Sequence, residues 1–435
     1  MMIRIALMVL ALATPLRAEI VIQDVTSPGG IKAWLVEDHS IPFTALEIRF
    51  QGGTSLDAPD KRGAVNLMTA LIEEGAGDLD SQGFAAARDA LAAEFSFSSD
   101  QDGVSVSTRF LTENRDQAMA LLQQALVAPR FDQVAVDRVR EQVLSGLRND
   151  EKDQSAIANM LTRARTFGDH PYATVGDGTI ASVTALTRDD IVAAYTASLA
   201  RDRITVAAAG DITAAELGLL LDTVLGKLPA TGAAQPGKAD MVIKSGVKVQ
   251  DFPGPQSVVL FGHGGIRFDD PDFFAASLLN EIFGGGRFGA RLMTEVREKR
   301  GLTYGIGTGL ASYDHSEAFV GQFQVSNDKA AEAIDVIRAE WAKIAADGVT
   351  DEELATAKTY MTGSYPLRFD GNGTIASILV GMQIMGLPTD YPKTRNARVE
   401  AVTMADMKRV AARLFQPDDL AFIVVGQPVG VVPTE

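Results

Sequence analysis

Cysteine and histidine, the side chains that most often bind zinc, are absent or rare in this sequence, and the histidines lie far apart. The 435 residues include no cysteine, which excludes thiolate ligands, cysteine nucleophiles and disulfides. The four histidines are too scattered for a local metal motif, and we expect surface or hydrogen-bonded structural roles for them: His39, His170, His263 and His315. Local motifs therefore predict no intrinsic metal.

Two other patterns have a chemical interpretation that their surroundings do not support. The first is an acidic run of Glu73, Glu74, Asp78 and Asp80, which lacks the loop pattern of a calcium site and is typical of a solvated helix end. The second is a G-x-G-x-x-G match at Gly284, Gly286 and Gly289. It follows an expected helix instead of a strand, so it indicates a flexible turn and not a dinucleotide site. No G-x-S-x-G elbow supports serine hydrolysis.

Composition and charge are those of an exported globular protein. With 46% hydrophobic and 22% charged residues, the chain is long enough for about two or three domains. Its formal charge of −16 argues against binding to nucleic acid or anionic lipid. Residues 1–18 combine Arg4, an apolar run from Ile5 to Ala13, Pro15 and a small Ala18, which predicts a signal peptide. Because about nine apolar residues cannot span a bilayer, we expect a periplasmic or secreted protein without a membrane span.

An internal repeat sets the expected architecture. Residues 181–210 align without a gap over residues 397–426, at an offset of 216, with seven identical pairs including Asp190/Asp406 and Gly210/Gly426. In each copy a threonine, Thr187 or Thr403, is placed to cap a helix with an aspartate at its third position, and an apolar strand ending in glycine follows. The chain is therefore expected to contain two copies of one unit.

The composition between the two copies predicts where they meet. Residues 228–238 are rich in Pro, Gly and Ala and lack helical or alternating periodicity, as a linker does. We expect domains at 19–228 and 244–435, joined by a linker at 229–243. Alternating strands such as Val104–Phe110 and Ala318–Val325 lie among longer amphipathic helices, which favours α+β halves with antiparallel sheets.

Two stretches carry a resemblance to a known family. They are residues 36–84, VEDHSIPFTALEIRFQGGTSLDAPDKRGAVNLMTALIEEGAGDLDSQGF, and residues 280–309, NEIFGGGRFGARLMTEVREKRGLTYGIGTG. Both resemble the insulinase-like (pitrilysin) zinc peptidases, and the likeness continues through His170–Tyr172 and the repeated segment. The resemblance implies two similar halves, each an antiparallel sheet backed by helices, arranged as a clamshell around peptides.

The zinc motif that this resemblance implies is missing. Active members carry H-x-x-E-H on the helix that begins at the position of Gly63, where two histidines bind zinc and the glutamate activates water. In this chain Asn66 and Ala70 stand at the histidine positions and Thr69 stands at the glutamate position. An apolar stripe that includes Leu67 and Leu71 survives, and Asn66, Thr69 and Ala70 are expected on the other side of the helix. We therefore expect the helix to form without its chemistry.

The third zinc ligand that the resemblance implies is also missing. It is a glutamate in a helix matching Gln133–Asn149, and the best placement puts Gly146 there. A mid-helix glycine costs about 1 kcal/mol relative to alanine, which suggests a position freed from a ligand role. Glu141 lies one to two turns away, but one carboxylate without the imidazole pair does not make a catalytic zinc site.

The second half retains what resembles the family's Arg and Tyr pair, at Arg297 and Tyr304. We expect Arg297 on the last turn of a helix that Gly301 ends, with Glu295 and Lys299 as an i,i+4 pair and Phe288 on an apolar stripe with Leu292 and Val296. Tyr304 is expected to start the next strand. A guanidinium and a phenol can hold a substrate carbonyl and stabilise an oxyanion. The alternative is that Arg297 forms a salt bridge at the helix end and that Tyr304 is a half-buried strand residue.

These observations together predict an inactive subunit. We expect the chain to have no activity alone, and a partner of the same family with an intact H-x-x-E-H to supply the zinc in a heterodimer that cleaves peptides. Arg297 and Tyr304 would then contact the substrate from this chain. The alternative, from another class of protein, is a non-enzymatic scaffold or peptide-binding protein.

Overall fold

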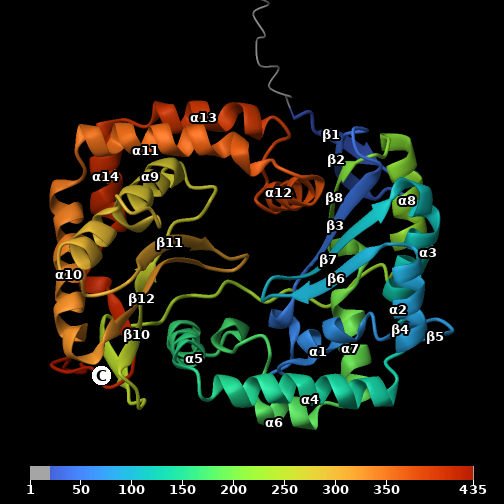
Figure 1. Cartoon of the computed structure of the whole chain (residues 1–435), viewed down its shortest axis with the longest axis horizontal. Coiled ribbons are helices and arrows are strands. Elements are labelled where there is room, and N and C mark those ends of the chain that lie inside the picture. Colours follow the sequence, from blue (N-terminus) through green and yellow to red (C-terminus); the bar gives the residue numbers. More distant parts are fainter. Residues whose placement is uncertain (1–19, 435) are drawn as a thin grey trace, which may run out of the picture.

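The first half of the chain forms a six-stranded sheet around the long central strand β3. The computed structural model describes residues 20–434, and the strands of the first sheet lie in the order β1-β2-β8-β3-β7-β6 (Figure 1). Their bounds are β1 Gln23–Thr26, β2 Lys32–Glu37, β3 Phe43–Gln51, β6 Glu94–Ser99, β7 Gly103–Leu111 and β8 Ile204–Gly210. A separate two-stranded sheet joins β4 (Gly75–Ala76) to β5 (Leu79–Asp80).

The second half repeats this arrangement with one strand fewer. Its sheet has the order β9-β13-β10-β12-β11, which matches β2-β8-β3-β7-β6 of the first sheet. The bounds are β9 Gly246–Gln250, β10 Gln256–Gly264, β11 Ile306–Ser312, β12 Glu317–Ser326 and β13 Ala421–Val425. Both sheets are antiparallel except for one parallel pair each, β2 with β8 and β13 with β9. That pair is parallel because the chain returns to it through several helices instead of a hairpin.

The helix caps that the repeat predicts are present in both halves. The side chain of Thr187 accepts a hydrogen bond from the backbone N–H of Asp190 at the start of α7, and Asp190 accepts one in return from the backbone N–H of Thr187. Thr403 and Asp406 form the same reciprocal pair at the start of α14. Strands β8 and β13 follow these helices. The prediction of two copies of one α+β unit is confirmed.

Helices cover one face of each sheet and form the two main cores. Leu46, Ile48 and Phe50 alternate along β3 and are buried against α1, α3, α7 and α8, while β10 and β12 pack in the same way on α9, α10 and α14 around the buried Trp341. The helix bounds in the first half are α1 Ala64–Leu71, α2 Ser81–Ala90, α3 Arg115–Val127, α4 Gln133–Asp150, α5 Gln154–Phe167, α6 Ile180–Ala185, α7 Arg188–Ser198 and α8 Ala214–Leu225. Those in the second half are α9 Phe273–Gly284, α10 Ala330–Asp347, α11 Asp351–Ser364, α12 Asn372–Ile384, α13 Tyr391–Ala401 and α14 Met404–Leu414.

Two helices cross over and cover part of the opposite sheet's other face. Helix α5 of the first half lies on β10 and β13, where Ala158 and its neighbours pack against Val258 and Val425. Helix α12 of the second half lies on β2, β3 and β8, where Leu379 packs against Ala207 (Figure 1). We call this arrangement the helix exchange. It buries apolar side chains between the halves and so fixes how the two sheets face each other.

Side-chain amides at the start of the exchanged helices bind the opposite sheet in equivalent ways. The Gln154 amide donates to the carbonyl of Gln256, the first residue of β10, over 2.8 Å. The Asn372 amide donates to the carbonyl of Phe43, the first residue of β3, over 3.4 Å. The two contacts are related by the internal repeat, because β3 and β10 occupy the same place in their sheets.

A second contact joins the halves at the tip of the β11–β12 hairpin. The Tyr172 hydroxyl, in the first half, donates to the carboxylate of Asp102 and accepts the backbone N–H of His315 from the hairpin. The backbone N–H of Asp314 donates to the other Asp102 oxygen over 3.2 Å. Tyr172 is fully buried, so the tip closes over an aromatic residue of the opposite half.

Neither helix nor strand lies between α8 and β9, although the segment is packed through contacts such as the Ala239 N–H to the His315 carbonyl. The division of the chain at 229–243 remains a prediction, and the predicted signal segment lies outside the described residues. Within residues 20–434, no helix combines the length and hydropathy needed to cross a bilayer.

The helix exchange predicts that a residue of α12 stabilises the first half. Replacing the fully buried Leu379 with alanine should lower the free energy of unfolding by about 2–5 kcal/mol, because a cavity opens against β8. Urea unfolding followed by circular dichroism measures this. Leu367→Ala is the matched control, since that leucine is 77% exposed and its loss should change stability by less than about 0.5 kcal/mol. Equal effects of the two variants would contradict the packing role of α12.

Candidate functional site

Helix α1, where the zinc motif is missing, is held at its start by a buried carboxylate. Asp57 accepts the backbone N–H of Gly63 over 2.8 Å through one oxygen and that of Val65 over 2.9 Å through the other. Gly63 has a φ of +92°, and a Cβ there would lie 2.7 Å from the Asp177 carbonyl, so only glycine fits. A carboxylate at a helix N-terminus accepts hydrogen bonds from the free N–H groups and is stabilised by the positive end of the helix dipole.

The burial of Asp57 makes it titrate in an unusual range. Only 7% of the residue is exposed, and this loss of hydration raises the pKa of its carboxyl to about 6, despite the hydrogen bonds that favour the ionised form. Arg62 lies beside it and donates to the Asp57 backbone carbonyl over 2.7 Å.

The three positions of the missing zinc motif differ in exposure. Asn66 is half-buried, and its side-chain oxygen lies 3.4 Å from the Ser99 hydroxyl, which donates to it. Ala70 is exposed one turn later. Thr69 is only 2% exposed and its hydroxyl donates to the Val65 carbonyl over 2.8 Å. The expectation that Thr69 lies away from the apolar stripe is therefore wrong, because its methyl group packs inward and its hydroxyl is satisfied within the helix.

Gly146 lies in α4, which runs beside α1 (Figure 1). It is exposed, and a Cβ added there would meet nothing within 4 Å. Glu141 is also exposed and lies 3.7 Å from Arg148 on the same helix. Gly146 therefore has no side chain that could bind a metal ion, although there is open space for one.

The residues at these positions do not fit a zinc ion. Asn66, Thr69 and Ala70 provide no imidazole, and Gly146 provides no side chain, so the donors that zinc prefers are lacking. Across residues 20–434, no group of three or more His, Asp or Glu side chains is arranged to hold a metal ion. Both ring nitrogens of His39 lie beside carboxylates, and His170 Nε2 and His263 Nδ1 lie beside backbone carbonyls. His170 Nδ1 accepts the backbone N–H of Tyr172 over 3.2 Å.

Arg297 lies on a π-helical turn, η5 (Met293–Glu298), that follows the glycine-rich loop at 284–289. Its guanidinium carbon lies 4.7 Å from the ring centroid of Phe288, and the side chain makes no hydrogen bond with the rest of the described chain. The predicted Glu295–Lys299 pair is present at 2.6 Å, and Gly301 adopts the left-handed conformation with a φ of +60°.

Phe288 differs from its expected place. It is 64% exposed, whereas Leu292 and Val296 are fully buried, so the apolar stripe does not include it. The loop turns its ring outward, where it supports Arg297 by a cation–π contact.

Tyr304 is almost fully exposed to solvent. It lies two residues before β11 instead of starting that strand, which is a correction to the expected position. The residue is 89% exposed and its hydroxyl has no hydrogen-bond partner within residues 20–434. A phenol in this state is free to donate to a ligand. The predicted roles of Arg297 and Tyr304 in substrate binding stay predictions.

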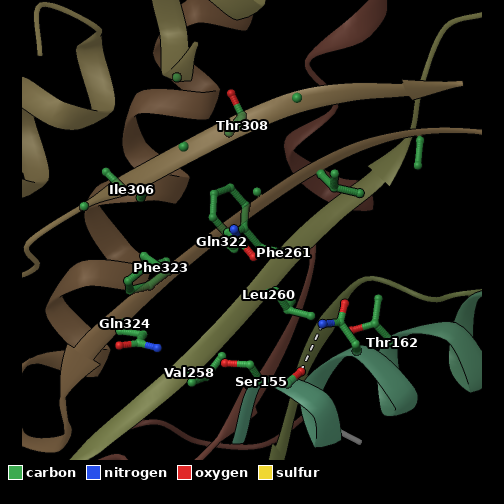
Figure 2. A pocket seen from close by; sticks show the side chains of 18 of the residues that line it. Ser155, Thr162, Val258, Leu260, Phe261, Ile306, Thr308, Gln322, Phe323 and Gln324 are labelled. Carbon is green, nitrogen blue, oxygen red and sulfur yellow. Dashed lines mark hydrogen bonds between the residues drawn. The ribbon is translucent and has the colours of Figure 1, made fainter. Parts of the chain in front are cut away.

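Tyr304 lines a large groove on the inner face of the second sheet. The groove has a volume of about 870 Å³ and lies between α5 on one side and the 284–286 loop on the other. Figure 2 shows Ser155 and Thr162 of α5 opposite Val258 and Leu260 of β10, with Gln322 and Gln324 of β12 beyond them. Both halves of the chain therefore build this groove, and the helix exchange brings them together.

A row of glycines forms part of the groove floor. Gly307 and Gly309 lie opposite Gln322 and Val320 in the pairing of β11 with β12, and residues opposite each other share a face. Gly305 lies just before β11 and lines the same groove. A Cβ at Gly305 or Gly309 would meet nothing within 4 Å. We call this site the glycine-floored groove. Its floor lets another backbone approach the sheet closely.

The same face of the first sheet has a different chemistry. Glu47 accepts a hydrogen bond from the Ser107 hydroxyl over 2.7 Å, and Arg49 pairs with Asp100 at 2.8 Å. Burial raises the pKa of Glu47. This wall carries charged side chains that are hydrogen-bonded or ion-paired, whereas the described lining of the glycine-floored groove has a single charged residue.

Two residues of these sites, Asp57 and Arg163, carry no local sequence signal that marks them. Asp57 lies six residues before Gly63 in an irregular segment, and only its burial distinguishes it. Arg163 lies on α5, and nothing near it in the sequence indicates a site in the other half. The internal repeat could have predicted that α5 and α12 occupy equivalent places in the two halves. It could not have predicted that each helix packs on the sheet of the opposite half.

Comparison with known proteins gives consistent matches over most of the chain. The family description "Insulinase (Peptidase family M16)" matches residues 32–175, and "Peptidase M16 inactive domain" matches residues 185–361. The chain is 25% identical over 396 residues to the non-peptidase homolog YmxG of Helicobacter pylori, covering 89% of this chain and 90% of that protein. It is also 25% identical over 397 residues to an uncharacterized zinc protease of Streptomyces coelicolor, covering 89% and 85%.

Among solved structures, a peptidase M16 inactive domain from Pseudomonas fluorescens superposes with a TM-score of 0.88 at 28% identity. The superposition covers 95% of this chain and all of that chain. The likeness thus extends over both halves and their relative placement.

The buried Asp57 predicts a specific pH dependence of stability. Its folded-state pKa of about 6 exceeds the unfolded value of about 3.9, so the folded chain binds the extra proton between these values. The contribution of this group is therefore greatest below pH 4 and falls by about 1–3 kcal/mol as the pH rises through 6. The free energy of unfolding of the wild type minus that of Asp57→Asn should decrease over this window in urea titrations at pH 4, 5, 6 and 7. A difference that does not change with pH would contradict the assignment.

The half-buried Asn66 and the exposed Ala70 and Gly146 predict that a metal site can be built on α1 and α4. The triple variant Asn66→His, Ala70→His and Gly146→Glu should retain about one zinc ion per chain after dialysis, because residues four apart share one helical face and Gly146 has open space. Elemental analysis by mass spectrometry measures the metal. The wild type should retain none, and the double histidine variant should bind more weakly. Equal binding by the double and triple variants would show that Gly146 is not the ligand position.

Proposed function

This chain belongs to the insulinase family of peptidases, peptidase family M16, as an inactive member, and on that premise we propose that it is the non-catalytic subunit of a heterodimeric zinc peptidase outside the cytoplasm. The partner is a chain of the same family with an intact H-x-x-E-H motif. The zinc in that partner, with its glutamate, supplies the activated water. This chain contributes binding surface and hydrogen-bond donors.

The observation that carries the proposal is the free state of Tyr304 at the glycine-floored groove. A tyrosine that is 89% exposed with an unpaired hydroxyl has no evident structural role, and it stands on a chain whose zinc positions cannot hold zinc. Arg297, stacked on Phe288, is likewise without a hydrogen-bond partner in the described part of the chain. A subunit that acts on a partner's substrate needs free hydrogen-bond donors but no zinc ligands of its own. This chain has that combination.

In this role the two donors act on the substrate carbonyl. The Arg297 guanidinium and the Tyr304 hydroxyl donate hydrogen bonds to that oxygen, and these bonds strengthen as negative charge develops on it. The ring of Phe288 limits the motion of the guanidinium, so less ordering is needed when substrate binds.

A peptide-holding scaffold without catalysis is the second candidate, and the groove itself favours it. An 870 Å³ groove is built by one chain alone and does not need a partner to exist. This alternative predicts a chain that captures peptides, forms no complex with a catalytic relative and cuts nothing.

Reconstitution with a catalytic relative separates the two candidates. The isolated chain should cleave no peptide, whereas co-expression with a neighbouring H-x-x-E-H chain should give a complex with chelator-sensitive peptidase activity. Arg297→Ala in that complex should lower kcat about 100-fold, because an oxyanion donor is lost. Arg300→Ala is the control on the same segment, since Arg300 is engaged with Glu295 at 2.8 Å, and it should leave kcat nearly unchanged. Full turnover by the Arg297 variant would remove that residue from the mechanism.

A further inference from the structure

The glycine-floored groove has a charge that does not match the rest of the protein. The chain carries 56 acidic and 40 basic residues, yet the described lining of the groove contains no carboxylate and a single charged residue, Arg163. The guanidinium of Arg163 has no hydrogen bond or ion pair within residues 20–434, although most arginines in the structure pair with an acid. An unpaired cation in a groove without anions favours an anionic ligand.

The other free polar groups of the groove are suited to oxygen atoms. Gln322 and Gln324 are exposed, and their side-chain amides have no partner among the described residues, as is also true of the Tyr304 hydroxyl. By contrast, Asn159 and Thr162 of α5 are bonded to carbonyls of their own helix. The unpaired donors therefore lie along β12 and at the mouth of the groove, with Arg163 on the facing wall. This set can bind a row of carbonyl groups and one carboxylate.

The floor of the groove is shaped for a backbone instead of a bulky group. Strand β11 has seven residues and so extends about 23 Å, and Gly307 and Gly309 leave part of its groove face without side chains. The apolar Val258, Leu260 and Val320 lie on the same face. An extended segment of several residues has the length and the narrow profile that this floor admits.

From these observations we propose that the glycine-floored groove binds an extended polypeptide segment bearing a carboxylate, which pairs with Arg163. The proposal rests on the proposed function, since it specifies the class of segment that this subunit holds. The carboxylate is either a Glu or Asp side chain or the C-terminus of the segment. Arg163 belongs to the first half, so the selection of ligand depends on the helix exchange.

The test uses the full-length chain and four ten-residue peptides built from Gly, Ser and Val, each with an uncharged fluorophore. Three have an amidated C-terminus and Glu, Gln or Lys at the centre, and the fourth has Gln at the centre with a free C-terminal carboxylate. Fluorescence anisotropy at low and at physiological salt gives the affinities. The Glu peptide should bind about tenfold more tightly than the Gln peptide, and the Lys peptide should bind most weakly. Tighter binding of the fourth peptide than of the amidated Gln peptide would show that the C-terminus supplies the carboxylate that pairs with Arg163.

Variants then separate charge from shape. Arg163→Gln should abolish the preference for Glu, and Arg163→Glu should reverse it in favour of Lys. Gly309→Val should weaken all four peptides alike, because its side chain fills open space above the floor without a clash in the fold. Arg148→Gln, an equal change of charge on α4 outside the groove, should change nothing.

Each outcome decides the proposal. Binding that is equal for the Glu, Gln and Lys peptides, or a preference that survives Arg163→Glu, would overturn it, as would no measurable binding of any peptide. These results leave the heterodimer proposal standing if the reconstituted complex is active. Conversely, charge-selective peptide binding without activity of the reconstituted complex would support the proposed class of ligand. It would also contradict the proposal that this chain is a subunit of a heterodimeric peptidase.

Discussion

The structure depends on one physical constraint, which is that each half must bury an apolar patch that its own helices leave open. The main helices cover one face of each sheet, and the opposite face carries small apolar residues such as Ala207 and Ala209 in the first half and Val258 in the second. Helices α12 and α5 cover these patches by crossing to the other half. The hydrogen bonds of Gln154 and Asn372 to the first residues of β10 and β3 set the position of each helix along its sheet.

The helix exchange also makes the site. If α5 did not cross to the second sheet, the glycine-rich face of that sheet would be open and would have no facing wall. Arg163, which α5 carries, would then lie away from Gln322 and Gln324. The same helix that contributes apolar contacts with one side thus contributes a free guanidinium with another. Stability and the shape of the groove are coupled here, because a change that loosens α5 from β10 also moves the wall of the groove.

Helix α1 folds without the residues of a zinc motif because its main core contacts are made at other positions. Leu67, Met68 and Leu71 are fully buried and hold the helix in the core. Asn66 and Ala70 lie on the more open side, where a change of residue alters chemistry without opening a cavity. Asp57 continues to cap the helix although no metal chemistry follows from it. The helix is therefore an intact structural element without the residues that zinc chemistry requires.

The sequence alone determined what depends on neighbouring residues. Local patterns predict the capping pairs of Thr187 and Thr403, the strand that follows each and the glycine end of the Arg297 segment. The absence of an H-x-x-E-H motif is a property of the sequence itself. The tertiary structure decided the burial of Thr69, the outward turn of Phe288, the exposure of Tyr304 and the arrival of Arg163 at the opposite sheet. The physical reason is range: caps and periodicity are set by hydrogen bonds and faces within a few residues, whereas these four positions depend on packing between segments that are far apart in the chain.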